Sequence, residues 1–369
     1  MTQRRRPSTS KARKAGSFAK LKSAARPSAI DLFCGCGGLS LGLKNAGFSV
    51  VAAVDTDALA CATYRANHRA TLLLEKDIQD IDPAELMVEL GLKEGELGLL
   101  AGCPPCQGFS TLRTLNGGKK ISEPMNDLVF QFSRFIKVFK PKSVMVENVP
   151  GLAGDERLAK FRGFLSAMGY KSCIDVFDAA DFGVPQRRRR MILLAARGTR
   201  PEFAAPAKRK RSVRSAIANL PAPQVTTDPA HNHPADRAPH VMDIIRRIPK
   251  DGGSRRELGE DAQLPCHRKC NGFKDIYGRM SWDKPSPTIT GGCINPSKGR
   301  FLHPEQDRAI TLREAAMLQG FPVNYRFDLS KGRYPAAQMI GNAFPPAFAA
   351  HHAKSLRGLI SCYLRNLET

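Results

Sequence analysis

The sequence predicts an α/β fold, a doubly wound, mostly parallel sheet with a second, smaller and loop-rich lobe. Three observations lead to this prediction. Apolar runs alternate with segments of helical periodicity from residue 28 to about residue 196, which is typical of parallel sheets covered by helices. Glycines or carboxylates follow several of these runs, as they do at the ligand-binding edge of such sheets. From about 197 to 305, Pro and Gly become frequent and helical periodicity is weak.

The expected elements follow in order from residue 28. A strand over 29–33 precedes a glycine-rich turn and a helix that ends near Gly47. The next strand, over 50–54, precedes a helix over about 57–67, and another strand would end at Asp77. Apolar residues recur at helical spacing from Leu128 to Phe139, with Asn126 placed as the N-cap. Further strands are expected at 97–101, 143–146, 174–177 and 191–195.

Composition divides the chain into four segments. Residues 1–27 hold nine Lys or Arg and no acid, so we expect a disordered basic tail, either a nucleic-acid contact or a solubilising leader. The main domain covers 28–196 and the loop-rich lobe covers 197–305. Helical signal returns at 312–319 and from about Pro346 to the end, so the segment 306–369 is expected to return to the main domain.

The net charge of +23 narrows the class of partner. Fifty-seven basic residues face 34 acidic ones over 369 residues, and this excess predicts a polyanion such as DNA, RNA or an anionic membrane. We expect no membrane-spanning helix and no secretory signal, because no apolar run is long enough. The ten cysteines are scattered, which is typical of reduced thiols, and no metal site is expected, Cys266 and Cys270 being a weak pair.

A nucleoside pocket is expected where the first strands end. The turn from Asp31 to Gly38 is rich in glycine, which lets backbone approach a ligand closely. Asp55 ends the second strand, where a carboxylate can accept hydrogen bonds from ribose hydroxyls, and Asp77-Ile78 would end a third. The sequence contains no P-loop pattern. The pocket therefore suits an adenosyl group better than a triphosphate, although turns of this kind also serve packing alone.

Cys106 is the candidate nucleophile. It directly follows Pro104 and Pro105, and proline fixes its own φ and pushes the preceding residue out of the helical region. We therefore expect the thiol on a stiff turn that leaves a strand, followed by a Gly-containing stretch that can close over a ligand. This suits a nucleophile that is shielded from water once its substrate is bound. The alternative is a buried, inert thiol.

Polar residues at two further strands complete the candidate site. Glu147 follows the strand at 143–146, and it is either a helix cap or a functional acid at the sheet edge that carries Cys106. Gln186, Arg188 and Arg190 enter the strand at 191–195 at alternate positions, so their side chains should share one face. Such a row suits phosphates, or fixed charge beside an acid and a pyrimidine carbonyl.

Taken together, these segments resemble the C5-cytosine DNA methyltransferase family. The resemblance covers roughly residues 28–369 and keeps the family's motif order, and eight motifs in order are very specific. The order runs Asp31–Gly38, Asp55, Asp77, Pro104–Gln107, Glu147–Val149 and Gln186-x-Arg188-x-Arg190, then, past a variable region, Arg313-Glu314 with Leu318–Pro322, and Gly341-Asn342. The implied fold is Rossmann-like, that of the class I S-adenosylmethionine-dependent methyltransferases.

The resemblance implies S-adenosylmethionine as the methyl donor. Phe33 would pack on it, with backbone contacts at Gly35 and Cys36. Asp55 would accept from the ribose hydroxyls and Asp77 from the adenine amino group. The other implied pocket residues are Thr56, Ile78, Leu128 and Asn342. The position of Thr56 is often aromatic in the family, so less stacking on adenine is expected here.

The implied reaction is methylation of carbon 5 of cytosine. The Cys106 thiolate would add to carbon 6 and turn the ring into an enamine-like nucleophile, which attacks the methyl sulfonium. Glu147 would contact N3 and the exocyclic amine, while Arg188 and Arg190 fix the pyrimidine carbonyl. Loss of the carbon-5 proton then expels Cys106. Because carbon 5 is inaccessible in a stacked duplex, the base would have to be flipped out.

The same resemblance assigns DNA contacts and lobes. Residues 28–196 would form the catalytic, cofactor-binding domain, and 197–305 the target-recognition domain. The expected DNA contacts are Gln107, Arg113, Lys119, Gln186 and Thr288. Weaker candidates for reading bases are Arg279, Lys284, Asn295, Lys298 and Arg300.

These observations predict a bacterial modification enzyme in the cytoplasm, associated with the nucleoid and monomeric. Its partner would be double-stranded DNA, with a cognate restriction endonuclease or as a solitary enzyme. Three alternatives remain. The tRNA-methylating branch of the family carries a Cys-Phe-Thr segment that this chain lacks. A DNA-binding protein without catalysis would not need Cys106 and Glu147. A thiol oxidoreductase fits Cys103 and Cys106 by spacing only.

Overall fold

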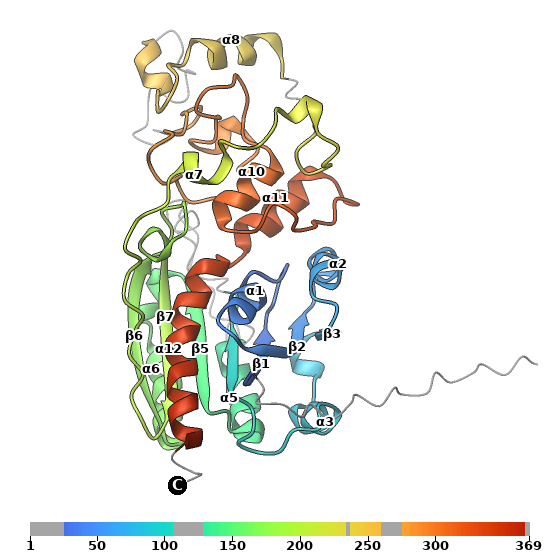
Figure 1. Cartoon of the computed structure of the whole chain (residues 1–369), viewed down its shortest axis with the longest axis vertical. Coiled ribbons are helices and arrows are strands. Elements are labelled where there is room, and N and C mark those ends of the chain that lie inside the picture. Colours follow the sequence, from blue (N-terminus) through green and yellow to red (C-terminus); the bar gives the residue numbers. More distant parts are fainter. Residues whose placement is uncertain (1–25, 106–127, 234–236, 260–274, 366–369) are drawn as a thin grey trace, which may run out of the picture.

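The computed structural model describes residues 26–105, 128–233, 237–259 and 275–365, which form two lobes, one above the other in Figure 1. The lower lobe contains a seven-stranded sheet in the order β3-β2-β1-β4-β5-β7-β6. Its strands are β1 Ser28–Leu32, β2 Ser49–Asp55, β3 Leu72–Glu75, β4 Leu99–Gly102, β5 Ser143–Asn148, β6 Tyr170–Asp178 and β7 Arg189–Arg197. β7 pairs antiparallel with β5 and with β6, whereas the other four pairs of neighbouring strands are parallel. The prediction of a mostly parallel, doubly wound sheet is confirmed.

Helices cover both faces of this sheet (Figure 1). Those of the lower lobe are α1 Gly38–Asn45, α2 Ala58–Asn67, α3 Pro83–Glu89, α5 Leu128–Phe139, α6 Glu156–Ala167 and α12 Pro346–Arg365. Those of the upper lobe are α7 Val213–Ile217, α8 Pro239–Arg247, α10 Leu312–Gln319 and α11 Arg333–Asn342. No helix in the described parts of the chain combines the length and the apolar character that crossing a membrane requires.

Local sequence explains where several helices begin. The Asp57 side chain accepts from the N–H groups of Leu59 and Ala60, so α2 starts where the sequence predicts. The sequence analysis did not identify α3 and α6, although both carry a start signal. Asp82 caps α3 with a proline after it, and Asp155 caps α6 with an acid after it.

The two faces of the sheet bury different sets of side chains. Aromatic residues of α5 and α6, among them Phe132, Phe135 and Phe161, pack on one face. The other face packs against α1 and α12, with Phe348 and Leu356 in that core. The C-terminal helix α12 therefore lies against α1, the helix that follows the first strand of the sheet.

The upper lobe has a core around α10 and α11, which reaches Cys36 and Ala60 of the lower lobe. Thr311 and Glu314 form a capping box at the start of α10. The Glu314 carboxylate also accepts two hydrogen bonds from Arg308, each 2.7 Å long. Although burial favours the protonated acid, the hydrogen bonds and the charge of Arg308 lower the pKa of Glu314. The lobe is thus organised around a buried ion pair as well as apolar contacts.

Candidate active site

A cavity of about 580 Å³ lies at the carboxyl edge of β1, β2, β4 and β5. Eleven residues that the sequence analysis singled out line it together: Phe33, Gly35, Cys36, Asp55, Thr56, Asp77, Ile78, Glu147, Arg188, Arg190 and Asn342. The volume is within the usual range for a bound organic molecule. At the β2–β3 side the cavity is lined by the carboxylates of Asp55 and Asp77. At the β5–β7 side it is lined by the ion pair of Glu147 and Arg190.

The turn after β1 has the geometry that its glycines permit. Gly35 and Gly37 have φ values of 52° and 95°, and Phe33 adopts φ 64° without being glycine. A left-handed phenylalanine is strained, and such residues gather at ligand sites. A Cβ on Gly38 would come 2.3 Å from the carbonyl oxygen of Phe344, so only glycine lets the turn approach that segment.

Asp55 faces this turn from the end of β2. Its Oδ2 accepts from the Gly35 N–H at 2.7 Å and its Oδ1 from the Asp57 N–H at 2.9 Å. Burial raises the pKa of Asp55, and these backbone hydrogen bonds act against that rise. Each carboxylate oxygen has a second lone pair, so the cavity side can still accept from a hydroxyl. Asp77 caps the short helix Ile78–Asp80.

A buried acid, Asp31, lies on β1 just before the glycine turn and bonds to Ser40 on the helix that follows this turn. Asp31 accepts from the Ser40 hydroxyl at 2.6 Å, and that hydroxyl lies 2.7 Å from the Tyr64 hydroxyl. Asp31 is fully buried, and burial raises its pKa to about 7. The sequence analysis gave this acid no separate role, because its position inside the turn does not reveal how deeply it lies.

The opposite end of the cavity holds an acid–base pair. Arg190 Nε lies 2.9 Å from Glu147 Oε1, and both side chains are largely buried. Cys103, which the sequence analysis did not select, lies beside them. Burial and then the charge of Glu147 raise the pKa of the Cys103 thiol well above its usual value. This thiol therefore stays protonated beside the carboxylate at neutral pH.

Arg188 is positioned by backbone carbonyls. Its Nη1 donates to Ile289 at 3.1 Å and to Gly341 at 2.9 Å. Burial and then the charge of Arg190 lower its pKa to about 9, so it keeps its charge at neutral pH. Arg188 and Gln186 are buried while Arg187 and Arg189 are exposed, which confirms the predicted alternation along this segment.

One side chain tethers the backbone at Pro104, two residues before Cys106 in the sequence. Asn148, the last residue of β5, donates from Nδ2 to the Pro104 carbonyl at 2.9 Å. Its Oδ1 accepts from the Val149 N–H at 2.8 Å. The sequence analysis named Asn148 only as part of a motif. The hydrogen bond from Asn148 to Pro104 joins the ends of two strands and could not be predicted from the sequence. The tether holds the backbone that leads to the proposed nucleophile.

Several predicted residues lie outside the described parts of the chain. These are Cys106, Gln107, Arg113 and Lys119, together with the proposed cap Asn126, most of the basic tail and the pair Cys266 and Cys270. Leu128 begins α5, but its side chain also lies outside the described set.

Gln186 and Thr288, two of the expected DNA contacts, differ in how far they are bonded within the protein. Gln186 is fully buried, its Nε2 donates to Gln319 and its Oε1 accepts from the Ile289 N–H at 2.8 Å. Its amide is thus bonded within the protein and offers DNA no surface in this structure. Thr288 is only partly buried, and its hydroxyl donates to the Arg187 carbonyl at 2.7 Å.

Arg279, one of the weaker candidates for reading bases, is bonded inside the upper lobe. Its side chain is fully buried and donates to the carbonyls of Ile245, Ile248, His303 and Gln306 and to the Asp307 carboxylate. Arg300 donates to the carbonyls of Gly252, Gly253 and Arg279. Both arginines tie loops of the upper lobe together, a use that sequence alone does not distinguish from a DNA contact. Asn295 caps a short helix, whereas Lys284 and Lys298 are exposed.

Comparison with known proteins agrees with this geometry. Residues 28–358 match the family described as C-5 cytosine-specific DNA methylase. The chain is 37% identical over 344 residues to the Type II methylase M.HgiDII of Herpetosiphon aurantiacus, covering 89% of this chain and 94% of that protein. It is 35% identical over 342 residues to the Type II methyltransferase M1.BsuMI of Bacillus subtilis, covering 85% of this chain and 77% of that protein.

Solved structures share the fold. One example is a DNA modification methyltransferase encoded within an E. coli prophage, with a TM-score of 0.66 and 24% identity over 91% of this chain and 99% of that one. The family match spans the glycine turn, the Glu147–Arg190 pair and the segment around Asn342. This chain therefore belongs to the C-5 cytosine-specific DNA methylase family and is a DNA cytosine-5-methyltransferase.

Proposed function

We propose that the protein transfers a methyl group from S-adenosylmethionine to carbon 5 of a flipped-out cytosine in a specific duplex DNA sequence, through a covalent bond between Cys106 and carbon 6. The observation that carries the proposal is the single cavity whose one side presents Phe33 and Asp55 and whose other side presents Glu147 and Arg190. A donor and a base bound there would be adjacent, which the reaction requires.

The cavity suits S-adenosylmethionine. Its volume is sufficient, and the carboxylates of Asp55 and Asp77 match the hydroxyl and amino donors of an adenosyl group. Phe33 would pack on it, Gly35 and Cys36 would offer backbone contacts, and the remaining wall would come from Thr56, Ile78, Leu128 and Asn342. When bound, the group supplies an electrophilic methyl on a sulfonium.

The residues of the chain would activate the cytosine. The Cys106 thiolate adds to carbon 6, which makes carbon 5 nucleophilic, and it leaves again when carbon 5 loses its proton after methylation. Glu147 accepts from the exocyclic amine, and from N3 once N3 gains a proton as the thiolate adds. Arg190 holds Glu147 while reaching the pyrimidine carbonyl. Arg188 fixes the strand that carries Arg190. Asn148 tethers the backbone at Pro104, two residues before Cys106.

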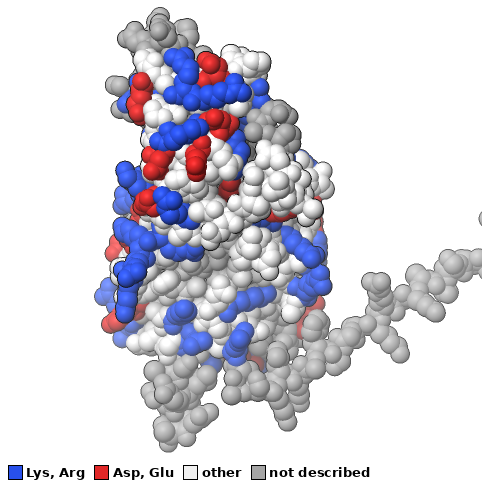
Figure 2. All heavy atoms as spheres, turned by 45° about the horizontal axis from the view of Figure 1, so that its top comes forward, with Lys and Arg blue, Asp and Glu red and all other residues white. Residues whose placement is uncertain are grey.

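The charge of the molecule favours DNA as the partner. Figure 2 shows Lys and Arg side chains in several groups at the top, along the left side and in the lower part of the visible face, with Asp and Glu mainly in its upper half. The net charge is +23, so a duplex would be held largely through its phosphates. Gln107, Arg113, Lys119 and Thr288 remain proposed contacts, whereas we now regard Gln186 as a positioning residue. Flipping the target base would cost a few kcal/mol.

The names of the relatives support a proposal for the biological setting. Because they are named Type II methylases, we propose a modification enzyme that acts as a monomer on the chromosome in the bacterial cytoplasm, beside a cognate restriction endonuclease or alone. Within it, 28–196 and the C-terminal helix α12 would form the catalytic domain, and the upper lobe would select the target sequence; because α10 and α11 pack into that lobe, we propose that it extends past residue 305 to α11.

Two measurements test the proposal. Bisulfite sequencing of DNA from cells that express the chain should show 5-methylcytosine confined to one sequence motif. An oligonucleotide with 5-fluorocytosine at that position should form a covalent adduct at Cys106, located by mass spectrometry, in the presence of the methyl donor. Methylation without any adduct would contradict the covalent step, and label on adenine or on RNA would contradict the substrate.

Glu147→Gln is expected to lower kcat by about 10²- to 10⁴-fold, because the variant keeps the shape but loses the carboxylate that stabilises the cytosine ring. The KM for the methyl donor should change little, since Glu147 lies at the far end of the cavity from Asp55. Steady-state kinetics with labelled donor measures both values. A large rise in donor KM with unchanged kcat would place Glu147 in donor binding instead.

A further inference from the structure

The hydroxyl of Tyr325 is bonded to the backbone of the glycine turn. Tyr325 lies between α10 and α11 and is buried. Its hydroxyl donates to the Cys36 carbonyl at 2.5 Å. The described residues that line the large cavity include Cys36 but not Tyr325, so the hydroxyl contacts the turn from outside the cavity. The sequence analysis gave Tyr325 no role, and no step of the reaction proposed above uses it.

The hydrogen bonds around this hydroxyl have one direction. A carbonyl only accepts, so the single proton of the Tyr325 hydroxyl goes to Cys36. The hydroxyl therefore accepts from His68, whose Nε2 lies 2.9 Å away. With the ring proton on Nε2, His68 Nδ1 accepts from Lys44 Nζ at 2.8 Å. Burial, and then the charge of Lys44, lower the pKa of His68 to about 3, so the ring stays neutral at pH 7.

The glycine turn passes directly against these side chains. A Cβ on Gly37 would come 2.4 Å from His68 Nε2 and 2.7 Å from the Tyr325 hydroxyl oxygen, so glycine is required for the close approach. Phe33, in the same turn, has a φ of 64°, which is costly for a residue with a side chain. Strained backbone of this kind persists only where the surrounding structure holds it. The hydrogen bond from Tyr325 is one such restraint.

Tyr325 is itself held by the upper lobe. Its ring packs against those of Phe321 and Phe327, with centroid distances of 4.6 Å and 5.3 Å. Arg313 of α10 donates from Nη1 to the Tyr325 carbonyl at 2.7 Å, and the same guanidinium is paired with Asp228. The residue that restrains the turn therefore belongs to a different lobe from the strands that form the cavity edge.

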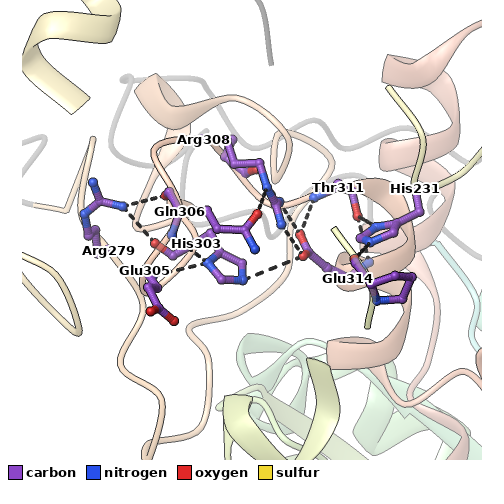
Figure 3. Close-up of polar contacts among 10 residues, drawn as sticks. His231, Arg279, His303, Glu305, Gln306, Arg308, Thr311 and Glu314 are labelled. Carbon is purple, nitrogen blue, oxygen red and sulfur yellow. Dashed lines mark hydrogen bonds and ion pairs between the residues drawn. The ribbon is translucent and has the colours of Figure 1, made fainter. Parts of the chain in front are cut away.

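The helix that carries Arg313 is bonded into the upper lobe at its first turn (Figure 3). Glu314 accepts from Nη1 and Nη2 of Arg308, each at 2.7 Å. The Thr311 hydroxyl lies 2.7 Å from His231 Nδ1. These buried contacts fix α10, so the contact between α10 and Tyr325 ties the glycine turn to the framework of the upper lobe.

We propose that Tyr325 is a positioning residue for the methyl donor, supplied by the upper lobe. Its hydroxyl holds the Cys36 carbonyl, and the turn thereby keeps the backbone shape that Gly35 and Cys36 present to the donor. This role rests on the proposed function, because it takes S-adenosylmethionine as the ligand of the turn. It adds that the donor site is complete only when the upper lobe is in contact with the turn.

Calorimetric titration of the full-length protein with S-adenosylmethionine, in the absence of DNA, tests this role. Tyr325→Phe keeps the ring and removes the hydroxyl, so the donor Kd should rise about 5- to 10-fold, as expected for one lost buried hydrogen bond. In steady-state methylation the donor KM should rise with the Kd, while kcat at saturating donor stays within about twofold of the wild type. Loss of stability alone would move neither the Kd nor the KM.

Tyr170→Phe is the matched control. Tyr170 is also buried, and its hydroxyl donates to the Pro141 carbonyl at 2.6 Å. It begins β6, however, at the edge of the sheet opposite to that of Asn148 and the cavity. Tyr170→Phe should lower the urea midpoint, as Tyr325→Phe does, and leave the donor Kd unchanged. Equal rises of the donor Kd in both variants would overturn the role of Tyr325.

His68→Leu is a second variant, which also serves if Tyr325→Phe does not fold. It removes the donor that orients the Tyr325 hydroxyl, so the donor Kd should rise, but less than in Tyr325→Phe. The double variant should bind the donor no more weakly than Tyr325→Phe alone, because both changes act through one hydroxyl. Additive losses would contradict this.

The same titration separates this role from the proposed function. A wild-type protein that does not bind S-adenosylmethionine would contradict the proposed function and this role with it. Donor binding to the wild type, with an unchanged Kd in Tyr325→Phe and in His68→Leu, would overturn the role of Tyr325 alone, and methylation itself would stand.

Discussion

A Cys106→Ala variant is expected to transfer no measurable methyl label to duplex DNA, a loss of about 10⁴-fold or more. Without the thiolate, carbon 5 of cytosine stays a poor nucleophile, and no other group described in the cavity can add to carbon 6. Filter binding with labelled donor measures the loss directly. Calorimetry should show that the donor still binds, because Phe33, Asp55 and Asp77 are untouched.

The neighbouring thiol supplies the control. Cys103 also lines the cavity, but burial beside Glu147 keeps it protonated, so Cys103→Ala should retain methylation and the 5-fluorocytosine adduct. Equal label from wild type and Cys106→Ala would remove Cys106 from the mechanism. Loss of the adduct in Cys103→Ala, with Cys106 intact, would place the covalent bond at Cys103 and contradict the proposed mechanism.

Acid is expected to destabilise the fold steeply below about pH 6.5. Burial lowers the pKa of His68 and of His352 to about 3 and that of His303 to about 4. Their unfolded pKa is about 6.5, so between pH 6.5 and 4 the unfolded chain binds three protons that the folded protein does not. The contribution of these three histidines to stability is therefore full above pH 6.5 and falls as the pH falls.

Asp31 partly offsets this loss. Its folded pKa of about 7 is above the unfolded value of 3.8, so the folded protein gains one proton as the pH falls through the same range. The net difference is two protons, or about 2.7 kcal/mol of unfolding free energy per pH unit. Since domains are stable by only about 5–15 kcal/mol, the protein should unfold near pH 4.

A variant of His352 tests the contribution of a single histidine to this pH dependence. Its ring is fully buried among Phe177, Phe182, Phe203 and Phe348, and neither nitrogen has a partner within the described residues. His352→Leu should raise the urea midpoint at pH 7 and halve its dependence on pH between 6.5 and 5. His351→Leu is the control, since that ring is partly exposed and bonded to the Ala347 carbonyl. Unchanged pH dependence in His352→Leu would show that this histidine is not the source.

The sequence was sufficient for those parts of the fold that depend on local pattern. Apolar runs identified the strands that line the site, and Asp57 identified the start of α2. The carboxylates and glycines of the cavity were found because parallel strands bring their carboxyl ends to one edge. Because side chains alternate between two faces along the segment that enters β7, the sequence distinguished Arg188 and Arg190 from the exposed Arg187 and Arg189.

What the sequence did not reveal depends on contacts between distant segments. Gln186 is buried because α10 and residue 289 bond its amide, and nothing near Gln186 in the chain indicates this. Arg279 has the composition of a base-reading residue but serves as the centre of a loop junction. Asn148 and Cys103 could be seen in the sequence as members of motifs. The hydrogen bond of Asn148 to Pro104 and the position of Cys103 beside Glu147 were apparent only from the structure.

The bonds of Gln186 and Arg188 also set a boundary for protein engineering. Gln186 receives the Ile289 N–H, Arg188 donates to the Ile289 carbonyl, and the Arg187 N–H donates to Ser286. A recognition segment exchanged between relatives should therefore end before Ser286. A chimera with that junction keeps the strand of the catalytic arginines seated, whereas one joined beyond Ile289 replaces the residues that seat it.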